Sequence, residues 1–194
     1  IETIRRDIHE LENLGMVKKV YGGIQLASDD LLVSDLQSWN NRMDNCLAEK
    51  QSIAQQTLEL IPDRSTIVLD IGTTTYALSR LLSARQDLTV ITCSLRIASE
   101  LSRNTDHCIY VIGGRLQKGE QVTMGSFARS FLDNFASIDL FLCGADGISL
   151  DTGITEFSEA IADIKKYLVS LSARTILLAD HSKFGKKSLF RCCS

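Results

Sequence analysis

Proline and long hydrophobic runs are scarce in this sequence. It has a single proline in 194 residues, and its longest apolar runs, such as residues 175–179, are far shorter than the roughly 18 residues of a membrane span. Collagen and low-complexity chains need more proline or glycine, and disordered chains are poorer in hydrophobic residues than the 44% found here. We therefore expect no membrane span, and one full globular domain with at most a small appendage.

Metal-binding and secretory signatures are also missing. The six cysteines are scattered except for Cys192 and Cys193, and no Cys-x-x-Cys or His-x-x-x-His spacing offers a metal site. No signal-peptide pattern precedes Ile1, so we expect reduced thiols and a cytoplasmic location. Because Ile1 already lies inside an amphipathic pattern, we expect the sequence to be a fragment of a longer chain. We expect no cofactor. A net charge of -3 gives no general attraction to nucleic acid, so any DNA contact must be local.

Residues 1–26 have the pattern of a helix followed by a hairpin. Apolar residues recur at steps of three and four, which places one stripe on a helix: Ile1, Ile4, Ile8, Leu11 and Leu14. Gly15 ends this helix, and residues 16–21 predict a short strand that turns at Gly22 and Gly23. Residues 27–43 show no sustained period, and we interpret them as a linker.

From residue 44 onward, apolar β-branched segments alternate with helical patterns. A helix from Leu47 to Ile61 ends at Pro62. The predicted strands are residues 66–70, 88–92, 108–112, 138–143 and 175–179. The predicted helices lie near residues 75–82, 95–102, 126–135 and 156–171. Apolar strands separated by helices predict an α/β domain over 44–194, with an open, mostly parallel sheet and helices on both faces.

Polar residues and glycines follow all five strands. They are Asp70, Gly72, Thr73, Thr74, Thr75, Ser94, Gly114, Arg115, Asp146, Gly147, Asp180 and Lys183. Ligands bind at the carboxyl ends of parallel strands, so we expect the five loops to form one pocket. A glycine followed by hydroxyl residues exposes backbone N–H groups that suit a phosphate. The same pattern also occurs in ordinary turns in which threonine caps the following helix. Glycines after strands also occur simply because the turn requires a positive φ.

The charges near these loops favour a phosphorylated polyol. Three cations could neutralise a phosphate, and three carboxylates could accept hydrogen bonds from sugar hydroxyls. The cations are Lys50, Arg115 and Lys183, and the carboxylates are Asp70, Asp146 and Asp180. Each of these cations could equally be a solvated surface residue. No histidine has a recognisable nucleophile partner, and Cys93 and Cys143 fit unreactive, buried thiols.

Two groups of motifs resemble those of DeoR/GlpR-type bacterial transcriptional regulators. Residues 3–15 with Tyr21-Gly22-Gly23 resemble their recognition helix and wing. The rest is similar, in the same order, to their sensor domain through Glu49-Lys50, Asp70-x-Gly72-Thr73-Thr74, Thr92-x-Ser94-Leu95, Gly113-Gly114, Gly144-Ala145-Asp146-Gly147-Ile148, Gly153-Ile154-Thr155 and Asp180-x-Ser182-Lys183-Phe184-Gly185.

This resemblance implies the remnant of a winged helix-turn-helix over 1–26 and an effector-sensing domain similar to ribose-phosphate isomerases and CoA transferases. It implies a repressor of sugar metabolism that binds a phosphorylated sugar as a homo-oligomer, a dimer or a tetramer. The residues facing the DNA major groove would be Thr3, Arg5 and Arg6. Phosphate would be held by Lys50, residues 72–75 and Lys183, and sugar by Asp146. Operator binding is expected of the full-length protein only, because the first two helices of that DNA-binding unit are not in this sequence.

An enzyme and an oligomerisation platform are the alternatives. An isomerase using the same pocket needs a carboxylate base, and Cys143 stands where the similar isomerases carry an additional aspartate. Glu156 or Glu159 could replace that aspartate, and we include Glu156 among the effector-binding residues. The sequence departs from the usual family pattern at Arg64, Ile71, Cys93 and the segment after Gly185, where we expect a missing sheet edge.

Overall fold

The computed structural model describes residues 2–13, 17–20, 23–26 and 39–193, which fall into two compact units divided after Asn41. In the first unit, α1 (Glu2–Asn13) is followed by β1 (Val17–Val20) and β2 (Gly23–Leu26). The two strands pair antiparallel, with Val17 opposite Leu26. The predicted helix and hairpin are therefore present, although Ile1, Leu14, Gly15 and Gly22 lie outside the described residues.

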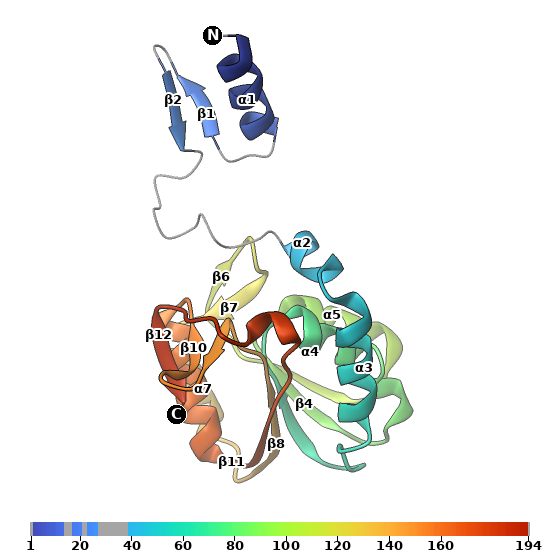
Figure 1. The fold of residues 1–194 in the computed structure, drawn as a ribbon. Coiled ribbons are helices and arrows are strands. Elements are labelled where there is room, and N and C mark those ends of the chain that lie inside the picture. Colours follow the sequence, from blue (N-terminus) through green and yellow to red (C-terminus); the bar gives the residue numbers. More distant parts are fainter. Residues whose placement is uncertain (1, 14–16, 21–22, 27–38, 194) are drawn as a thin grey trace. The chain divides into compact units, whose positions relative to one another are not determined.

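A five-stranded parallel sheet forms the centre of the second unit (Figure 1). Its strands are β3 (Thr66–Leu69), β4 (Thr89–Thr92), β5 (Cys108–Val111), β8 (Ile138–Cys143) and β11 (Ser172–Leu177). Their order is β11-β8-β3-β4-β5, so β3 pairs with β4 on one side and with β8 on the other. The predicted parallel sheet is confirmed.

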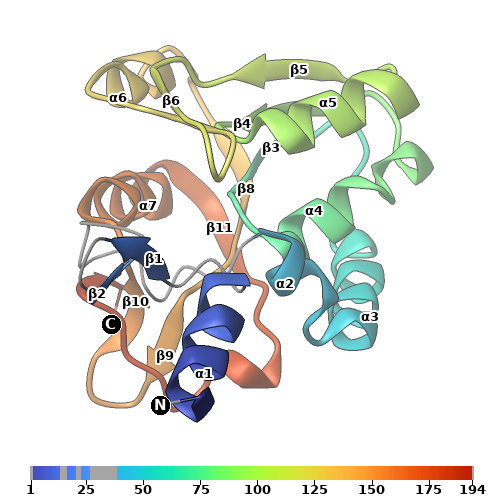
Figure 2. The same cartoon turned by 90° about the horizontal axis from the view of Figure 1, so that it is seen from above.

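Helices cover both faces of this sheet (Figure 2). On one face lie α3 (Leu47–Leu58), α4 (Thr73–Ser79) and α5 (Leu95–Asn104), and on the other lie α6 (Phe127–Leu132) and α7 (Glu159–Leu171). Side chains alternate along β3: Ile67 and Leu69 join the first core and Val68 joins the second. Burial on both faces explains why the inner strands β3, β4 and β8 read as continuous apolar runs.

The fifth strand begins earlier than predicted, at Ser172 instead of Thr175. Ser172 pairs with Ile138, and Arg174 pairs with Leu140. These backbone hydrogen bonds need no apolar side chains, so hydropathy alone did not reveal the start of this edge strand. Within the described ranges, the 3-10 turns are η1 (Leu82–Ala84) and η2 (His181–Lys183), and η2 follows β11.

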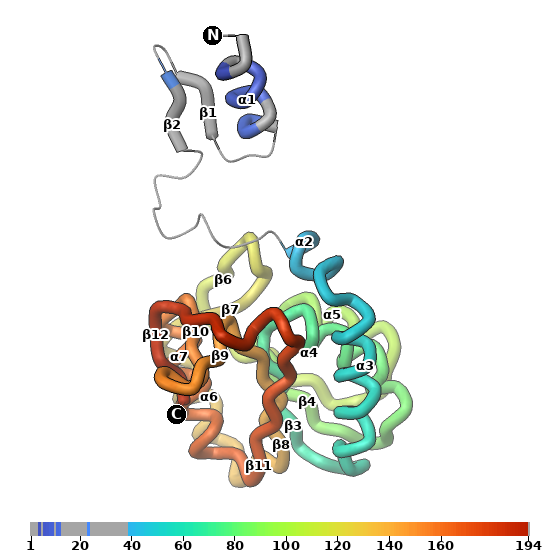
Figure 3. Tube along the Cα trace, in the orientation of Figure 1, coloured from blue at the N-terminus to red at the C-terminus, as the bar shows by residue number. Residues whose placement is uncertain are grey.

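The sequence did not predict five further short strands. β6 (Arg115–Gln117) and β7 (Val122–Met124) form a hairpin. β9 (Gly147–Ser149), β10 (Gly153–Glu156) and β12 (Phe190–Cys193) form an antiparallel sheet with β10 in the middle (Figure 3). Thus the segment after Gly185 contributes a strand to this small sheet. No described helix is both long and apolar enough to cross a membrane.

Two predicted helix boundaries differ from the structure. The helix expected from Glu156 begins at Glu159, because Glu156 is the last residue of β10 and pairs with Phe190. The helix expected over 126–135 is only six residues long. Of the expected linker, residues 27–38 lie outside the described part, and the remainder belongs to α2 (Trp39–Asp44).

Candidate functional site

A buried lysine joins the carboxyl ends of β3, β8 and β10. Lys165 Nζ lies 2.7 Å from Asp70 Oδ2 and donates to the carbonyl of Gly144 at 2.9 Å. It also forms an ion pair with Glu156. The Gly144 N–H donates in turn to Asp70 Oδ2 at 3.1 Å. Lys165, Asp70 and Glu156 are all buried, so their contacts with one another hold the three strand ends in place.

The electrostatics of this cluster follow from two carboxyl groups sharing one ammonium. Burial raises the pKa of Glu156 to about 8, against the opposing charge of Lys165, and the nearby Asp146 and Asp70 add to the rise. Burial by itself would lower the pKa of Lys165, but Asp70 and Glu156 outweigh it and raise that pKa. Lys165 is therefore the fixed positive charge of the cluster.

Sequence reasoning missed Lys165, although the sequence carries a signal for it. Along α7, Ile161, Ile164 and Leu168 mark the stripe that faces the core, and Lys165 falls on the same stripe. A lysine at a core position needs a buried anion. The predicted residue Asp146 lies beside the cluster, where its Oδ2 accepts a hydrogen bond from the backbone N–H of Phe157 at 2.9 Å.

Lys50, Asp180 and Lys183 form a second group, between α3 and η2. Lys50 is buried, and its Nζ donates to the backbone carbonyls of Arg42 and Asn45. Burial lowers the pKa of Lys50, and Asp180 opposes that effect. Burial would raise the pKa of Asp180, but the hydrogen bond from Ser182 and the charges of Lys183 and Lys50 lower it. The two lysines and Asp180 therefore share one electrostatic environment.

The loop from Gly72 to Thr75 opens α4. Gly72 has φ 146°, a value that favours glycine, and the three threonines after it are buried. The Thr75 hydroxyl donates to the Gly72 carbonyl at 3.0 Å, as in an ordinary turn. In the part of the chain that the structure describes, the hydroxyls of Thr73 and Thr74 have no hydrogen-bond partner. These two hydroxyls remain available to a ligand.

Ser94, Gly114 and Arg115 adjoin the β6–β7 hairpin, and Ser94 also follows β4, the neighbour of β3. The Ser94 side chain accepts a hydrogen bond from the N–H of Ile97 and so caps α5. A Cβ on Gly114 would lie 2.5 Å from the carbonyl oxygen of Met124. Arg115 is exposed on β6. Ser94 and Gly114 thus have structural roles of their own.

Gly147 also has a packing role. A Cβ at this position would lie 2.7 Å from the carbonyl oxygen of Lys186 and 2.9 Å from the Thr155 hydroxyl. The absence of a side chain therefore lets the segment after η2 pass close to β9.

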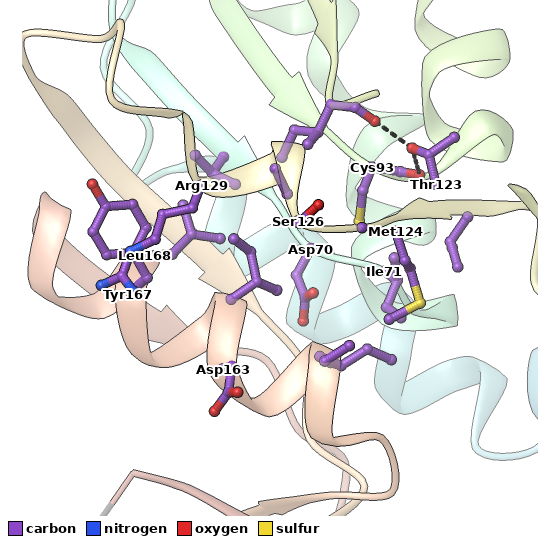
Figure 4. Close-up of a pocket in the computed structure, with 18 of the residues that line it drawn as sticks. Asp70, Ile71, Cys93, Thr123, Met124, Ser126, Arg129, Asp163, Tyr167 and Leu168 are labelled. Carbon is purple, nitrogen blue, oxygen red and sulfur yellow. Dashed lines mark hydrogen bonds between the residues drawn. The ribbon is translucent and has the colours of Figure 1, made fainter. Parts of the chain in front are cut away.

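A cavity of about 400 Å³ lies between the sheet and helices α6 and α7 (Figure 4). Its walls are mostly apolar, and the guanidinium of Arg129 lies 4.3 Å from the centre of the Tyr167 ring. Cys93 faces the cavity, and burial raises the pKa of its thiol to about 12. Of the predicted effector-binding residues, Asp70 alone lines this space. The expectation of one pocket formed by all five loops is therefore not met by this cavity.

The predicted DNA-binding residues all belong to α1. The Arg6 side chain is exposed, whereas the side chains of Thr3 and Arg5 lie outside the described part.

Comparisons with known proteins match both units. The family model of the DeoR C-terminal sensor domain matches residues 45–194. The family model of the DeoR-like helix-turn-helix domain matches residues 1–30. The chain is 31% identical to the glycerol-3-phosphate regulon repressor of Escherichia coli, covering 97% of this chain and 73% of that protein. It is 33% identical to the transcriptional repressor GlcR of Bacillus subtilis, covering 98% and 71%.

A solved structure has a similar fold. D-ribose-5-phosphate isomerase in complex with phospho-erythronic acid aligns with a TM-score of 0.54 and 20% identity, over 72% of this chain and 55% of that chain. At this identity, the likeness concerns the fold alone.

Proposed function

The chain belongs to the DeoR family of transcriptional regulators, and on this premise we propose that it is a DNA-binding repressor of sugar-metabolism genes controlled by a phosphorylated sugar. Thr3, Arg5 and Arg6 would contact the operator. The protein would act in the cytoplasm as a homo-oligomer, a dimer or a tetramer, because paired recognition helices fit the two-fold symmetry of an operator.

One relationship carries the location of the effector. β3, β8 and β11 are parallel neighbours in the sheet, so the loops that follow them leave from the same edge. These loops carry the unpartnered Thr73 and Thr74 hydroxyls, Asp146 and Lys183. Hydroxyls and an ammonium suit a phosphate, and a carboxylate suits sugar hydroxyls. We therefore assign the effector to this edge.

The chemistry around Glu156 favours a sensor over an isomerase. A base that moves a proton between carbon atoms must reach the substrate, but Glu156 is only 3% exposed and is paired with Lys165. Burial raises the pKa of the Cys143 thiol, so Cys143 is a poor base at neutral pH. Incubation with ribose 5-phosphate should give no turnover, and turnover that disappears in Glu156→Gln would overturn this preference.

A thermal-shift panel of phosphorylated sugars tests effector binding. At about one hundred times its dissociation constant, a bound sugar phosphate should stabilise the fold by about 2.7 kcal/mol. Lys183→Ala and Thr74→Ala should abolish this shift, whereas Thr74→Ser, which keeps the hydroxyl, should retain it. Lys166→Ala on the exposed side of α7 is the matched control for loss of a lysine.

The outcomes separate the alternatives. No shift with any sugar phosphate would favour an oligomerisation platform over a sensor. A full shift in both Lys183→Ala and Thr74→Ala would contradict the assigned location.

A further inference from the structure

Four potential metal ligands meet between the start of α3 and η2. They are Cys46, Glu49, Asp180 and His181. Each offers one ligand atom, and these four atoms all lie within 4.8 Å of one another. They represent sulfur, nitrogen and oxygen donors from two segments that lie far apart in the sequence. This cluster takes no part in the Lys165 network or in the cavity beside α6 and α7.

Local geometry directs the four side chains toward each other. Cys46 directly precedes α3 and Glu49 follows one turn later, so both lie on one side of the helix start. His181 Nδ1 lies 2.7 Å and 2.9 Å from the two carboxylate oxygens of Glu49. The backbone N–H of His181 donates to Glu49 Oε2 at 3.1 Å. Asp180 holds its place by accepting a hydrogen bond from the Ser182 N–H. The site is therefore preassembled on two anchored segments.

The cluster is closed on one side and open on the other. Asp180 is 3% exposed, whereas the His181 side chain is 75% exposed and that of Glu49 is 44% exposed. A hydrated cation can therefore reach the cluster from solvent, and the outer ligands have room to rotate onto it. A route of entry is one requirement of a real metal site.

We propose that Cys46, Glu49, Asp180 and His181 bind one divalent cation of the zinc type. Thiolate, imidazole and carboxylate are the ligands that Zn²⁺ takes in proteins, whereas Mg²⁺ and Ca²⁺ prefer oxygen alone. Ligand distances of about 2.0–2.3 Å place the corners of a zinc tetrahedron roughly 3.3–3.8 Å apart. Pairs of atoms as far apart as 4.8 Å must close by about 1.0–1.5 Å, and His181 Nδ1 must move slightly away from Glu49, from which it is now 2.7 Å distant. The exposed side chains of Glu49 and His181 allow these movements.

The surrounding charges are compatible with this cation. A thiolate and two carboxylates around a 2+ ion leave one negative charge, and Lys50 and Lys183 act electrostatically on Asp180 from close by. Four protein ligands leave no open position, so the ion would be structural and would tie α3 to η2. We expected no metal from the sequence, because these ligands have no metal-binding spacing along the chain.

Titration of the reduced 194-residue chain with Co²⁺ alone tests the proposal independently of any effector. We expect one equivalent to bind with tetrahedral cobalt absorption and a thiolate-to-cobalt charge-transfer band, and Zn²⁺ to displace it. Cys46→Ser should remove the charge-transfer band and weaken Co²⁺ binding about tenfold or more. Glu49→Gln should weaken binding while keeping the band.

Two cysteine variants serve as matched controls. Cys108→Ser removes an exposed thiol on β5, and Cys193→Ser removes one of two adjacent thiols whose sulfur atoms are 3.4 Å apart. Both should bind Co²⁺ like the unaltered chain, and circular dichroism should show the same fold in all variants. An unchanged band in Cys46→Ser, a band lost in Cys193→Ser, or no binding by the unaltered chain would overturn the proposal.

Discussion

Lys165 Nζ lies 2.7 Å from Asp70 Oδ2, and the two side chains are 3% and 5% exposed. One comes from the middle of α7 and the other directly follows β3. The pair thus joins a helix that packs on the sheet to the sheet edge where the effector is assigned. The Lys165–Asp70 pair stabilises the fold only while both charges are present, because a buried charge without its counter-charge is costly.

Lys165→Met should therefore be strongly destabilising. It keeps the length of the side chain but leaves the buried Asp70 carboxylate without its cation and Glu156 without its hydrogen-bond donor, which should cost about 3–5 kcal/mol of unfolding free energy. Urea denaturation followed by circular dichroism measures this loss. Lys166→Met, at the exposed neighbouring position, should change stability by no more than about 0.5 kcal/mol. Equal losses in the two variants would contradict a buried ion pair.

The protonation of Glu156 should make stability depend on pH. Its pKa of about 8 in the folded chain lies above the ordinary value of 4.5, so the folded state holds more protons between these values. The contribution of Glu156 is fully present below about pH 4.5 and is lost as the pH rises to about 8. Unfolding free energies measured across this range should fall with pH, and more steeply in the unaltered chain than in Glu156→Gln. Identical slopes would show that Glu156 does not titrate in this window.

Two adjacent glycines should respond differently to alanine. Gly114 has φ 149°, and an added Cβ would lie 2.5 Å from the Met124 carbonyl oxygen, so Gly114→Ala should cost about 1–3 kcal/mol. At Gly113 an added Cβ meets nothing within 4 Å, and Gly113→Ala should change stability by about 0.5 kcal/mol or less. Thermal unfolding of both variants makes the comparison. A larger loss of stability in Gly113→Ala than in Gly114→Ala would contradict the close approach described at Gly114.

The thiols should react in an order set by burial. The thiolate is the reactive form. Burial raises the pKa of Cys93 to about 12, and burial also raises the pKa of Cys143. Cys108 is exposed on β5. Alkylation at neutral pH, followed by peptide mass spectrometry, should label Cys108 well before Cys93 and Cys143. Early labelling of Cys93 would indicate that the cavity beside it opens readily to solvent.

The three inner strands of the central sheet, β3, β4 and β8, were predictable from the sequence because they are buried on both faces. Segments such as Ile138–Cys143 are almost entirely apolar, and a short apolar run bounded by turn residues is typical of a strand buried in a parallel sheet. The small antiparallel sheet was not predictable in the same way. β9 has only three residues, and the other partner of β10 is β12, where Thr155 pairs with Arg191 from a distant segment of the chain that no local pattern identifies.

The site was predictable only in its parts. The polar residues after the strands were located correctly in sequence, but their hydrogen bonds divide them into separate groups. Ser94 caps a helix and Lys50 binds backbone carbonyls, which are roles that residue type alone does not distinguish from ligand binding. Lys165 remained hidden because a lysine is ordinarily a surface residue.

The position of β3 at the middle of the sheet has a consequence for synthesis of the chain. The backbone N–H of Thr66, the first residue of β3, donates a hydrogen bond to the carboxylate of Asp139 on β8, 73 residues later in the sequence. At ribosomal rates of about 5–20 residues per second, β3 waits roughly 4–15 s for that neighbour. During this interval one flank of an apolar strand is open to chaperones or to strands of other nascent chains.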